Sequence, residues 1–343
     1  MGQAISKLTI KGYKSIRNLE NFELRNLNIL IGPNGSGKSN FVSFFELLQA
    51  IANEKGLPLF YVEKKGGADK FLYLGPKVTQ SIKAELEIVN LPLKYTFELS
   101  VTANNKFSRS TRMPIWDPNF ADLTRHDIEK IFSTYHFHDT SDFAGVKRPC
   151  SKRDYEYLRP DASNLAAFLW YLKKNHEKEY QMIREVTQLA APFFDDFLLR
   201  NSLDNPDETL LEWRQKGSDY PFLPSQISDG TLRFICLATA LLQPNLPSTI
   251  LLDEPELGLH PYALTLLAGL IQKASIKTQV IVSTQSAPLI DHFQPEDIVI
   301  VERQNGESIF KRLKKDELKV WLDDYSLGDL WQMNVISGRP ARE

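Results

Sequence analysis

Residues 29–41 read Ile29-Leu30-Ile31-Gly32-Pro33-Asn34-Gly35-Ser36-Gly37-Lys38-Ser39-Asn40-Phe41, and they join two apolar segments. The preceding run predicts a strand, and the apolar spacing that follows predicts a helix. A strand, a glycine-rich turn and a helix in this order are the context that a phosphate-binding loop requires. The glycines let backbone N–H groups converge, and the start of the helix adds partial positive charge, so a polyphosphate is stabilised there. Taken alone, the stretch could also be a glycine turn without a ligand.

Two residues of this loop have defined tasks in phosphate chemistry. Lys38 is placed to reach the β- and γ-phosphates of a nucleotide, and the hydroxyl of Ser39 is placed to hold Mg²⁺. No Asn-Lys-x-Asp guanine-reading motif occurs, so the nucleotide is expected to be ATP and not GTP. The predicted nucleotide-binding set in this loop comprises Gly32, Pro33, Asn34, Gly35, Ser36, Gly37, Lys38, Ser39 and Asn40.

The composition favours an ordinary globular chain in a reducing compartment. The 343 residues (39.3 kDa) are 42% hydrophobic and 24% charged, with a formal net charge of −2. This charge excludes a protein that wraps nucleic acid by overall charge, and no apolar run is long enough to span a membrane. Two cysteines that are far apart give no disulfide or metal framework, so we expect a cytoplasmic protein.

Coarse periodicity predicts an α/β fold with added β and helical parts. Alternation predicts two or three strands in 5–31 and an antiparallel pair in 78–103, with a loop to about Lys77 between them. Residues 161–199 have the spacing of amphipathic helices. The predicted parts are an N-terminal ATPase lobe (1–104), an inserted, mostly helical or irregular subdomain (105–225) and a C-terminal ATPase lobe (226–343).

The second half of the chain contains a second candidate anion site. Ile227-Ser228-Asp229-Gly230-Thr231 precedes an apolar helix, and Ser228 is a good N-cap residue. The free amides at such a helix start bind anions. As a bare pattern this is weak, because any capped helix looks similar.

Paired carboxylates follow at the end of a predicted strand, Thr249-Ile250-Leu251-Leu252-Asp253-Glu254. Asp253 is expected to hold Mg²⁺, and Glu254 is expected to polarise the attacking water. A buried strand that ends at a polar loop is the plain alternative. The next predicted strand, 279–282, ends in Ser283-Thr284-Gln285, and polar side chains at this end of a parallel strand face the ligand crevice. Gln285 is therefore a candidate sensor of the γ-phosphate or of water.

Three other features have ordinary interpretations. His136 and His138 would share one face of a strand, but without a third ligand we interpret them as packing residues. Basic pairs occur at 147–153 and at 311–315, and a solvated face is the preferred interpretation of each. DNA binding by the pairs at 147–153 stays open.

Together these elements resemble the ABC-type ATPases of the SMC, RecF and OLD group. The resemblance rests on four segments: Leu8 to Ile16, Gly32 to Asn40, Ser228 to Thr231, and Leu252 to Pro261. It implies a P-loop NTPase core of ABC type and a head-to-tail dimer, or a higher oligomer, with ATP between the copies. In such a dimer Ser228 and Gly230 of one copy would face the γ-phosphate held by Lys38 of the other, and residues 256–261 would form the loop that crosses between the sites.

Two departures from the group matter for function. Gln285 stands where the group usually has a switch histidine, and because glutamine cannot take a proton we expect slow turnover. OLD proteins carry a TOPRIM nuclease domain after the ATPase, and the residues after Val301 are too few for one. The resemblance therefore implies an effector on another polypeptide, such as a nuclease, as in prokaryotic anti-phage or toxin-like systems.

The leading hypothesis is an ATP-driven dimerising switch that controls this effector and is associated with DNA. One alternative is a slowly hydrolysing, ATP-bound scaffold that assembles and holds a partner protein. A less favoured alternative is the nucleotide-binding subunit of a membrane transporter. That subunit usually has a Gly-Gly signature and a switch histidine, whereas this chain has Asp229-Gly230 and Gln285. We expect no contact with a membrane.

Overall fold

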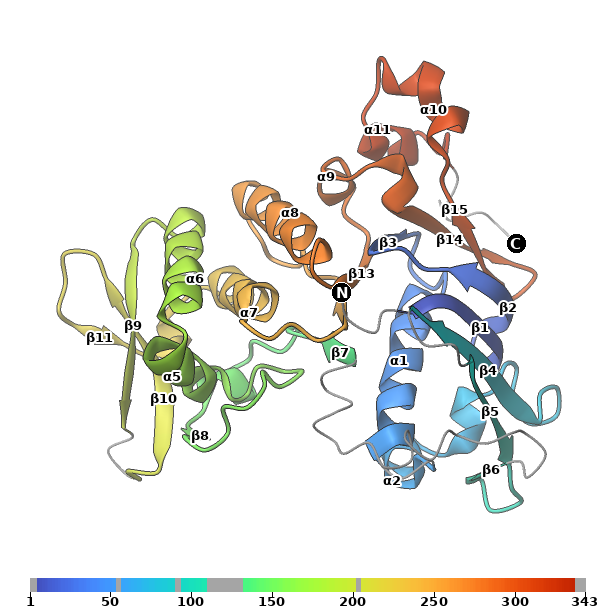
Figure 1. Cartoon of the computed structure of the whole chain (residues 1–343), viewed down its shortest axis with the longest axis horizontal. Helices are drawn as coiled ribbons and strands as arrows, with labels where there is room; N and C mark the ends of the chain where they lie inside the picture. Colours follow the sequence, from blue (N-terminus) through green and yellow to red (C-terminus); the bar gives the residue numbers. More distant parts are fainter. Residues whose placement is uncertain (1–4, 54–56, 90–93, 110–131, 202–204, 337–343) are drawn as a thin grey trace. The chain divides into compact units, whose positions relative to one another are not determined.

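The computed structural model describes residues 5–53, 57–89, 94–109, 132–201 and 205–336 (Figure 1). Its contacts divide the chain into two compact units, each of which is considered by itself. The first unit comprises residues 1–134, 247–253 and 275–343, and the second comprises residues 135–246 and 254–274.

The first unit is built on a six-stranded sheet whose central strands are parallel. Three of them, β3 (Leu27–Ile31), β12 (Thr249–Asp253) and β13 (Gln279–Thr284), are buried along their whole length, as parallel strands covered on both faces are. In order across the sheet, the strands are β15 (Glu307–Arg312), β14 (Ile298–Gln304), β3 (Leu27–Ile31), β13 (Gln279–Thr284), β12 (Thr249–Asp253) and β7 (Phe132–Tyr135).

A second, antiparallel sheet completes the first unit and confirms the predicted β-rich part. The alternation that predicted an antiparallel pair in 78–103 matches the burial pattern of one of its strands, in which Ile82, Ala84, Leu86 and Ile88 are buried. Its strands, in order, are β2 (Ile16–Glu23), β1 (Ile5–Tyr13), β4 (Ser81–Ile88), β5 (Lys94–Val101) and β6 (Phe107–Arg109).

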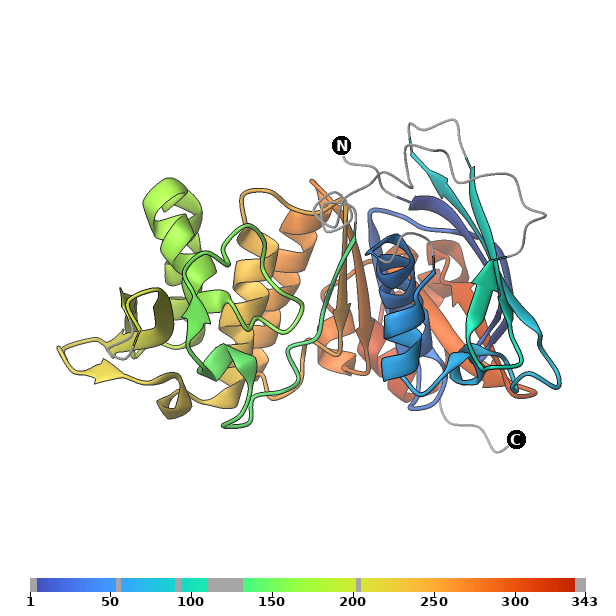
Figure 2. The same cartoon turned by 90° about the horizontal axis from the view of Figure 1, so that it is seen from below.

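The helix after the glycine loop, α1 (Lys38–Asn53), lies between these two sheets (Figure 2). Phe41, Phe44 and Phe45 are fully buried in one apolar cluster with residues of both sheets. Burying each ring contributes roughly 2 kcal/mol. Because both faces of α1 are covered, its first turn, and the loop that leads into it, are held firmly against the parallel sheet.

Short helices complete the first unit, and some of them were not predicted. The segment before Lys77, predicted as a loop, contains two helical turns whose Val62 and Phe71 are buried against the cluster around α1. The helices are α2 (Leu59–Lys64), η1 (Ala68–Phe71), α9 (Ala287–Ile290), η4 (Pro295–Asp297), α10 (Lys315–Leu322) and α11 (Leu327–Gln332).

The second unit packs helices against a small antiparallel sheet. Its longest helices are α5 (Leu165–Asn175), α6 (Glu177–Ala190), α7 (Asp229–Leu242) and α8 (Pro261–Ser275), with short turns η2 (Gly145–Lys147) and η3 (Pro224–Gln226). Its strands are β8 (Cys150–Ser151), β9 (Phe194–Asn201), β10 (Glu208–Gln215) and β11 (Pro221–Phe222). α7 is buried almost throughout, and burial raises the pKa of its Cys236 thiol to about 12, so this thiol is a core group.

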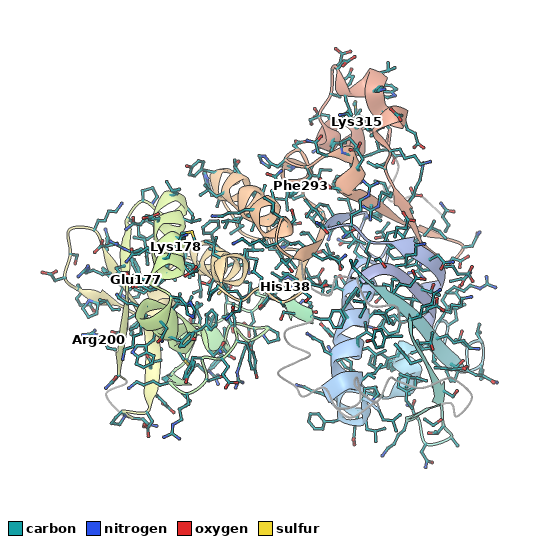
Figure 3. All side chains as sticks on the ribbon, in the orientation of Figure 1. His138, Glu177, Lys178, Arg200, Phe293 and Lys315 are labelled. Carbon is teal, nitrogen blue, oxygen red and sulfur yellow. The ribbon has the colours of Figure 1, made fainter. Side chains whose placement is uncertain are left out.

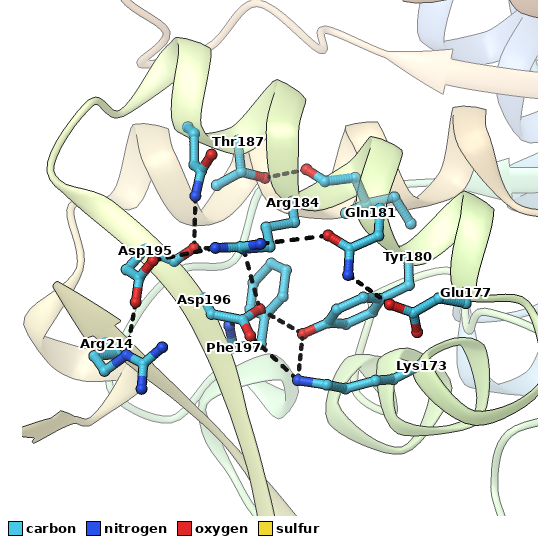
Figure 4. Close-up of polar contacts among 12 residues, drawn as sticks. Lys173, Glu177, Tyr180, Gln181, Arg184, Thr187, Asp195, Asp196, Phe197 and Arg214 are labelled. Atoms are coloured by element: carbon cyan, nitrogen blue, oxygen red, sulfur yellow. Dashed lines mark hydrogen bonds and ion pairs between the residues drawn. The ribbon is translucent and has the colours of Figure 1, made fainter. Parts of the chain in front are cut away.

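Part of the helical prediction for 161–199 is wrong, because residues 194–199 belong to β9. Phe194 and Phe197 have helical spacing, but the antiparallel pairing of Leu199 with Leu211 of β10 prevails over it. Charged side chains tie this strand to α5 and α6 (Figure 4). Tyr180 donates to Asp196 at 2.6 Å, and the Arg184 Nε donates to the Asp195 carbonyl at 2.8 Å. The inserted part is therefore a mixed α/β layer.

The boundaries of the two contact units differ from those of the three sequence ranges proposed above. α7 belongs to the same unit as residues 135–228, whereas the strands β12 and β13 belong to the same unit as the N-terminal residues. Within the described ranges, no helix is both long enough and apolar enough to cross a membrane.

Candidate functional site

The glycine loop occupies residues 32–37, between β3 and α1, and its glycines are required by close contacts and by backbone geometry. A Cβ at Gly32 would lie 2.1 Å from the carbonyl oxygen of Val301, and a Cβ at Gly37 would lie 2.0 Å from the Ser308 Oγ. Gly35 and Gly37 have φ of 79° and 107°, which favour glycine. The loop is thus a tight backbone turn against β14 and β15, a geometry in which backbone amides bind anions.

Lys38 begins α1 and is held at this loop. Its side chain is almost wholly buried, and its Nζ donates to the carbonyl oxygens of Gly32 (2.6 Å) and Pro33 (3.1 Å). A buried ammonium group at a glycine-rich loop is a strong local attraction for a polyphosphate. Ser39 follows directly in the first turn of the helix.

The sheet register places Asp253 on the same face as α1. Asp253 pairs with Ser283, and Ser283 pairs with Leu30, so the three residues form one row across parallel strands. Residues in register on neighbouring parallel strands point to the same face. Leu30 belongs to the cluster around α1. The carboxylate of Asp253 therefore faces the side of the sheet on which the loop and Ser39 lie.

Glu254 follows Asp253 and has a strained backbone. Its φ is 44°, in the left-handed region that glutamate rarely adopts. The turn interrupts the alternation of β12, so the side chain of Glu254 is not directed as a continuing strand would direct it. Strain of this kind is typical of functional positions, where the surrounding structure holds it in place.

Gln285 lies directly after β13, at the same edge of the sheet as the glycine loop. Thr284, the last residue of β13, pairs with Ile31, the last residue of β3, so the two strands end side by side. Ser286 then caps α9 by accepting from the Leu289 amide at 3.2 Å. The half-buried Gln285 is fixed between the end of a strand and the start of a helix.

Ser228 and Gly230 lie in the second unit, at the start of α7. The Ser228 Oγ accepts from the Thr231 amide at 3.2 Å, which is the predicted N-cap. A Cβ at Gly230 would lie 2.2 Å from the carbonyl oxygen of Gly258. Glycine at this position therefore lets the start of α7 touch the segment that follows Glu254.

Comparison with known proteins assigns the family. A protein-family profile described as "AAA domain, putative AbiEii toxin, Type IV TA system" matches residues 27–291, which is most of the chain. The chain belongs to this AAA family. No curated protein matches it significantly.

Solved structures show the same fold for the AAA chain. It is similar to an SMC head bound to the C-terminal winged-helix domain of ScpA (20% identity, TM-score 0.63, covering 92% of this chain and 99% of that one). It is also similar to the Pyrococcus furiosus Smc head bound to the C-terminal domain of ScpA (17%, 0.62, 94% and 99%) and to the Thermotoga maritima SMC head (17%, 0.50, 91% and 100%). The fold is thus that of a P-loop ATPase of the ABC type, and ATP binding and hydrolysis are the chemistry of the family.

The residues of this AAA chain fit a nucleotide with Mg²⁺. Ser36 Oγ and Ser283 Oγ are buried and, within the described part of the chain, have no hydrogen-bond partner. Buried hydroxyls without partners are rare, and a ligand that bonds to them removes the cost. One carboxylate, that of Asp253, suffices for such a Mg²⁺ site, because phosphate oxygens and water supply the other ligands.

Arg233, on α7, was missed by the sequence analysis because its partners are distant in the chain. Buried Arg233 donates to the carbonyl oxygens of Phe137 (2.8 Å) and His138 (3.1 Å) and also to that of Leu257, next to Gly258. Lys147 has its Nζ 3.4 Å from the Asp229 carboxylate. Both side chains fix the start of α7, and no short sequence motif predicts either contact.

The basic pairs at 147–153 and the two histidines lie within the second unit. The side chain of Lys147 is only 7% exposed, and Lys152 donates to Asn201 and to the Pro206 carbonyl, so these lysines do not form the solvated face that was expected. The rings of His136 and His138 lie 6.0 Å apart (His138 is labelled in Figure 3). No group of three or more potential metal-ligand side chains occurs within the described ranges.

Proposed function

We propose that this chain is a Mg²⁺-dependent ATPase whose copies close head to tail around ATP and which, in that closed form, regulates a separate effector protein. The order of the glycine loop, Asp253 and Glu254 on an ABC-type fold supports the ATPase part. The closed form follows from differential affinity, because a nucleotide that binds two surfaces at once favours their association.

Each residue has a role at the proposed site. The loop amides and Lys38 bind the β- and γ-phosphates, while Ser39 and Asp253 would hold Mg²⁺. Bound Mg²⁺ would neutralise charge on the phosphate oxygens. Glu254 orients the attacking water and accepts its proton, and Gln285 donates a hydrogen bond toward the γ-phosphate.

The contact between Gly230 and Gly258 is the observation that most supports a shared site. It joins the start of α7, where Ser228 is exposed, to the segment that directly follows Glu254. A phosphate that engages Ser228 and Gly230 from another copy would therefore act on the segment adjacent to the catalytic carboxylate. This connection links closure to hydrolysis.

The proposal of a separate effector rests on similarity to related proteins. The family description calls the matched AAA domain itself a putative toxin of a type IV toxin–antitoxin system, which supports a role of this chain within a toxin-like system. Two of the similar SMC heads are described in complex with ScpA, so this fold can carry a partner protein. Anti-phage defence is the setting that we propose, with DNA as a further candidate ligand.

A slowly hydrolysing scaffold is the second candidate function. Gln285 favours it, because an amide at this position can donate to a phosphate but cannot accept a proton. Under this alternative, ATP holds an assembly together and turnover is incidental.

Mixing two inactive variants tests the shared site. Lys38→Ala removes the phosphate contact, and Ser228→Arg blocks the start of α7. A head-to-tail heterodimer of the two variants retains one intact site, whereas each homodimer has none. A 1:1 mixture should therefore regain up to about a quarter of wild-type ATPase activity, because half of the dimers are mixed and each has one of two sites.

The outcomes separate the alternatives. Recovery on mixing supports a site built from two copies. A mixture as inactive as its components, with both variants folded by circular dichroism, would contradict the shared site. Robust activity of Lys38→Ala alone would contradict the assignment of the phosphate loop.

A further inference from the structure

The glycine loop is contacted from outside by two serines that come from opposite ends of the chain. Ser308, on β15, is buried, and its Oγ lies 2.6 Å from the Ser36 carbonyl oxygen and 2.7 Å from the Ser15 Oγ. Ser15 lies in the turn between β1 and β2, and its hydroxyl accepts from the Asn40 Nδ2 at 2.7 Å. A backbone bond from the Ser308 amide to the Ser15 carbonyl, at 2.8 Å, fixes the two segments to each other.

The Ser308 hydroxyl is the donor in both of its short contacts. It donates to the Ser36 carbonyl oxygen and to the Ser15 Oγ, so its single proton is shared between these two acceptors. The Ser15 Oγ also accepts from the Asn40 Nδ2, which holds Ser15 beside Ser308.

The bond from Ser308 to the Ser36 carbonyl orients a peptide of the loop. In a trans peptide the C=O and the following N–H point in opposite directions. Because Ser308 holds the Ser36 carbonyl on the outer side of the loop, the N–H of Gly37 is directed to the inner side. The fit is close, since a Cβ at Gly37 would lie 2.0 Å from the Ser308 Oγ and 2.6 Å from the Ser15 Oγ.

We propose that Ser308, supported by Ser15, is a positioning residue that holds the glycine loop in its phosphate-binding conformation before the nucleotide binds. The proposal rests on the nucleotide-binding part of the proposed function. A loop that is already oriented loses less conformational freedom on binding, so the nucleotide binds more tightly. The β14–β15 hairpin thereby becomes part of the nucleotide site without touching the nucleotide.

Ser308→Ala tests this role. Loss of the bond to Ser36 should weaken the binding of both Mg²⁺–ADP and Mg²⁺–ATP by roughly tenfold, since both place a β-phosphate in the loop. Dissociation constants are measured by calorimetry on the full chain, and the unfolding midpoint is measured without nucleotide. Ser108→Ala is the matched control, because the Ser108 hydroxyl also donates to a carbonyl, that of Ser100 at 3.2 Å, but in the other sheet.

Two further variants separate positioning from simple destabilisation. Ser308→Thr keeps the hydroxyl and should restore most of the affinity. Ser15→Ala should weaken binding as well, and the double variant should lose little more than Ser308→Ala alone, because Ser15 acts on the loop through the position of the Ser308 hydroxyl.

Each outcome decides a separate question. Affinity in Ser308→Ala equal to wild type and to Ser108→Ala would overturn the inference and leave the proposed ATPase intact. A midpoint that drops together with the affinity, without rescue by Ser308→Thr, would also overturn it. A wild-type protein that binds neither nucleotide would contradict the proposed function and this inference with it.

Discussion

At the scale of single residues, the proposed catalytic role of Glu254 comes with a free-energy cost in its backbone conformation. Its left-handed φ of 44° costs an L-residue roughly 1–2 kcal/mol. A position kept for packing alone would favour glycine here. The cost is offset if the carboxylate has a task that glycine cannot perform, which is the reason for proposing Glu254 as the general base.

Glu254→Gln and Glu254→Gly separate these two effects. Both should lower steady-state ATP hydrolysis by roughly 100-fold or more, because the proton acceptor is lost. Only Glu254→Gly removes the side chain that opposes the left-handed φ, so it should unfold at a higher denaturant concentration than Glu254→Gln. Phosphate release and urea titration measure the two properties, and ordinary turnover by Glu254→Gln would remove this residue as the base.

A substitution at Gln285 is expected to raise the rate of ATP hydrolysis instead of lowering it. Gln285→His supplies a group that can both donate to the γ-phosphate and exchange a proton, so turnover should rise, by roughly tenfold or more if proton transfer limits the rate. Single-turnover and steady-state rates are compared with wild type at pH 7. An unchanged rate would count against the idea that glutamine makes this ATPase slow.

At the scale of elements, the sequence predicted the helices and strands that depend on residues close together in the chain. The strand, loop and helix at 28–53 and the antiparallel pair at 81–101 are confirmed, because their apolar spacing and turn residues are contiguous in the chain. β9 was mistaken for helix, since its pairing with β10 outweighs its own spacing. β15 and α11 were not predicted at all.

The residues of the candidate site likewise fall into those that short motifs could identify and those that they could not. The glycine loop, Asp253, Glu254 and Ser228 could be proposed from short motifs, and their assignment stays a proposal. Ser308 and Arg233 could not, because each acts on a segment far from it in sequence. Their partners include backbone carbonyls, which every residue type supplies, so the sequence does not indicate these contacts.

The contact of α7 with the segment after Glu254 predicts the effect of Gly230→Ala. The new methyl group would meet the Gly258 carbonyl at 2.2 Å, so one segment must move. We expect ATPase activity to fall by roughly 100-fold or more, as catalysis is sensitive to displacements of about 1 Å. The affinity of a single copy for nucleotide should stay near that of wild type, because the glycine loop is unchanged.

Gly269→Ala is the matched control for this prediction. It lies on α8, where an added Cβ would meet nothing within 4 Å. This change should preserve activity and raise the free energy of unfolding by about 1 kcal/mol, the difference between alanine and glycine in a helix. Equal activity of Gly230→Ala and Gly269→Ala would show that the contact with Gly258 has no part in catalysis.

At the scale of the whole molecule, charge limits how the chain can engage DNA. The net charge is −2, so any DNA contact depends on local cations. Of the four basic residues at 147–153, Lys147 and Lys152 have internal partners, whereas Arg148 and Arg153 are exposed. In the second cluster Lys311 pairs with Glu317 at 3.6 Å.

The salt dependence of DNA binding should therefore be shallow. Two exposed arginines neutralise about two phosphates, so the logarithm of the binding constant should fall with a slope of about −2 against the logarithm of salt concentration. Fluorescence anisotropy of a labelled duplex between 50 and 200 mM salt measures the slope, with Arg148→Gln/Arg153→Gln as the variant that abolishes it. A much steeper slope in the presence of Mg²⁺–ATP, unchanged in that variant, would place the DNA contacts on a surface made only by the closed dimer. No binding at any salt would leave a protein as the partner that the ATPase controls.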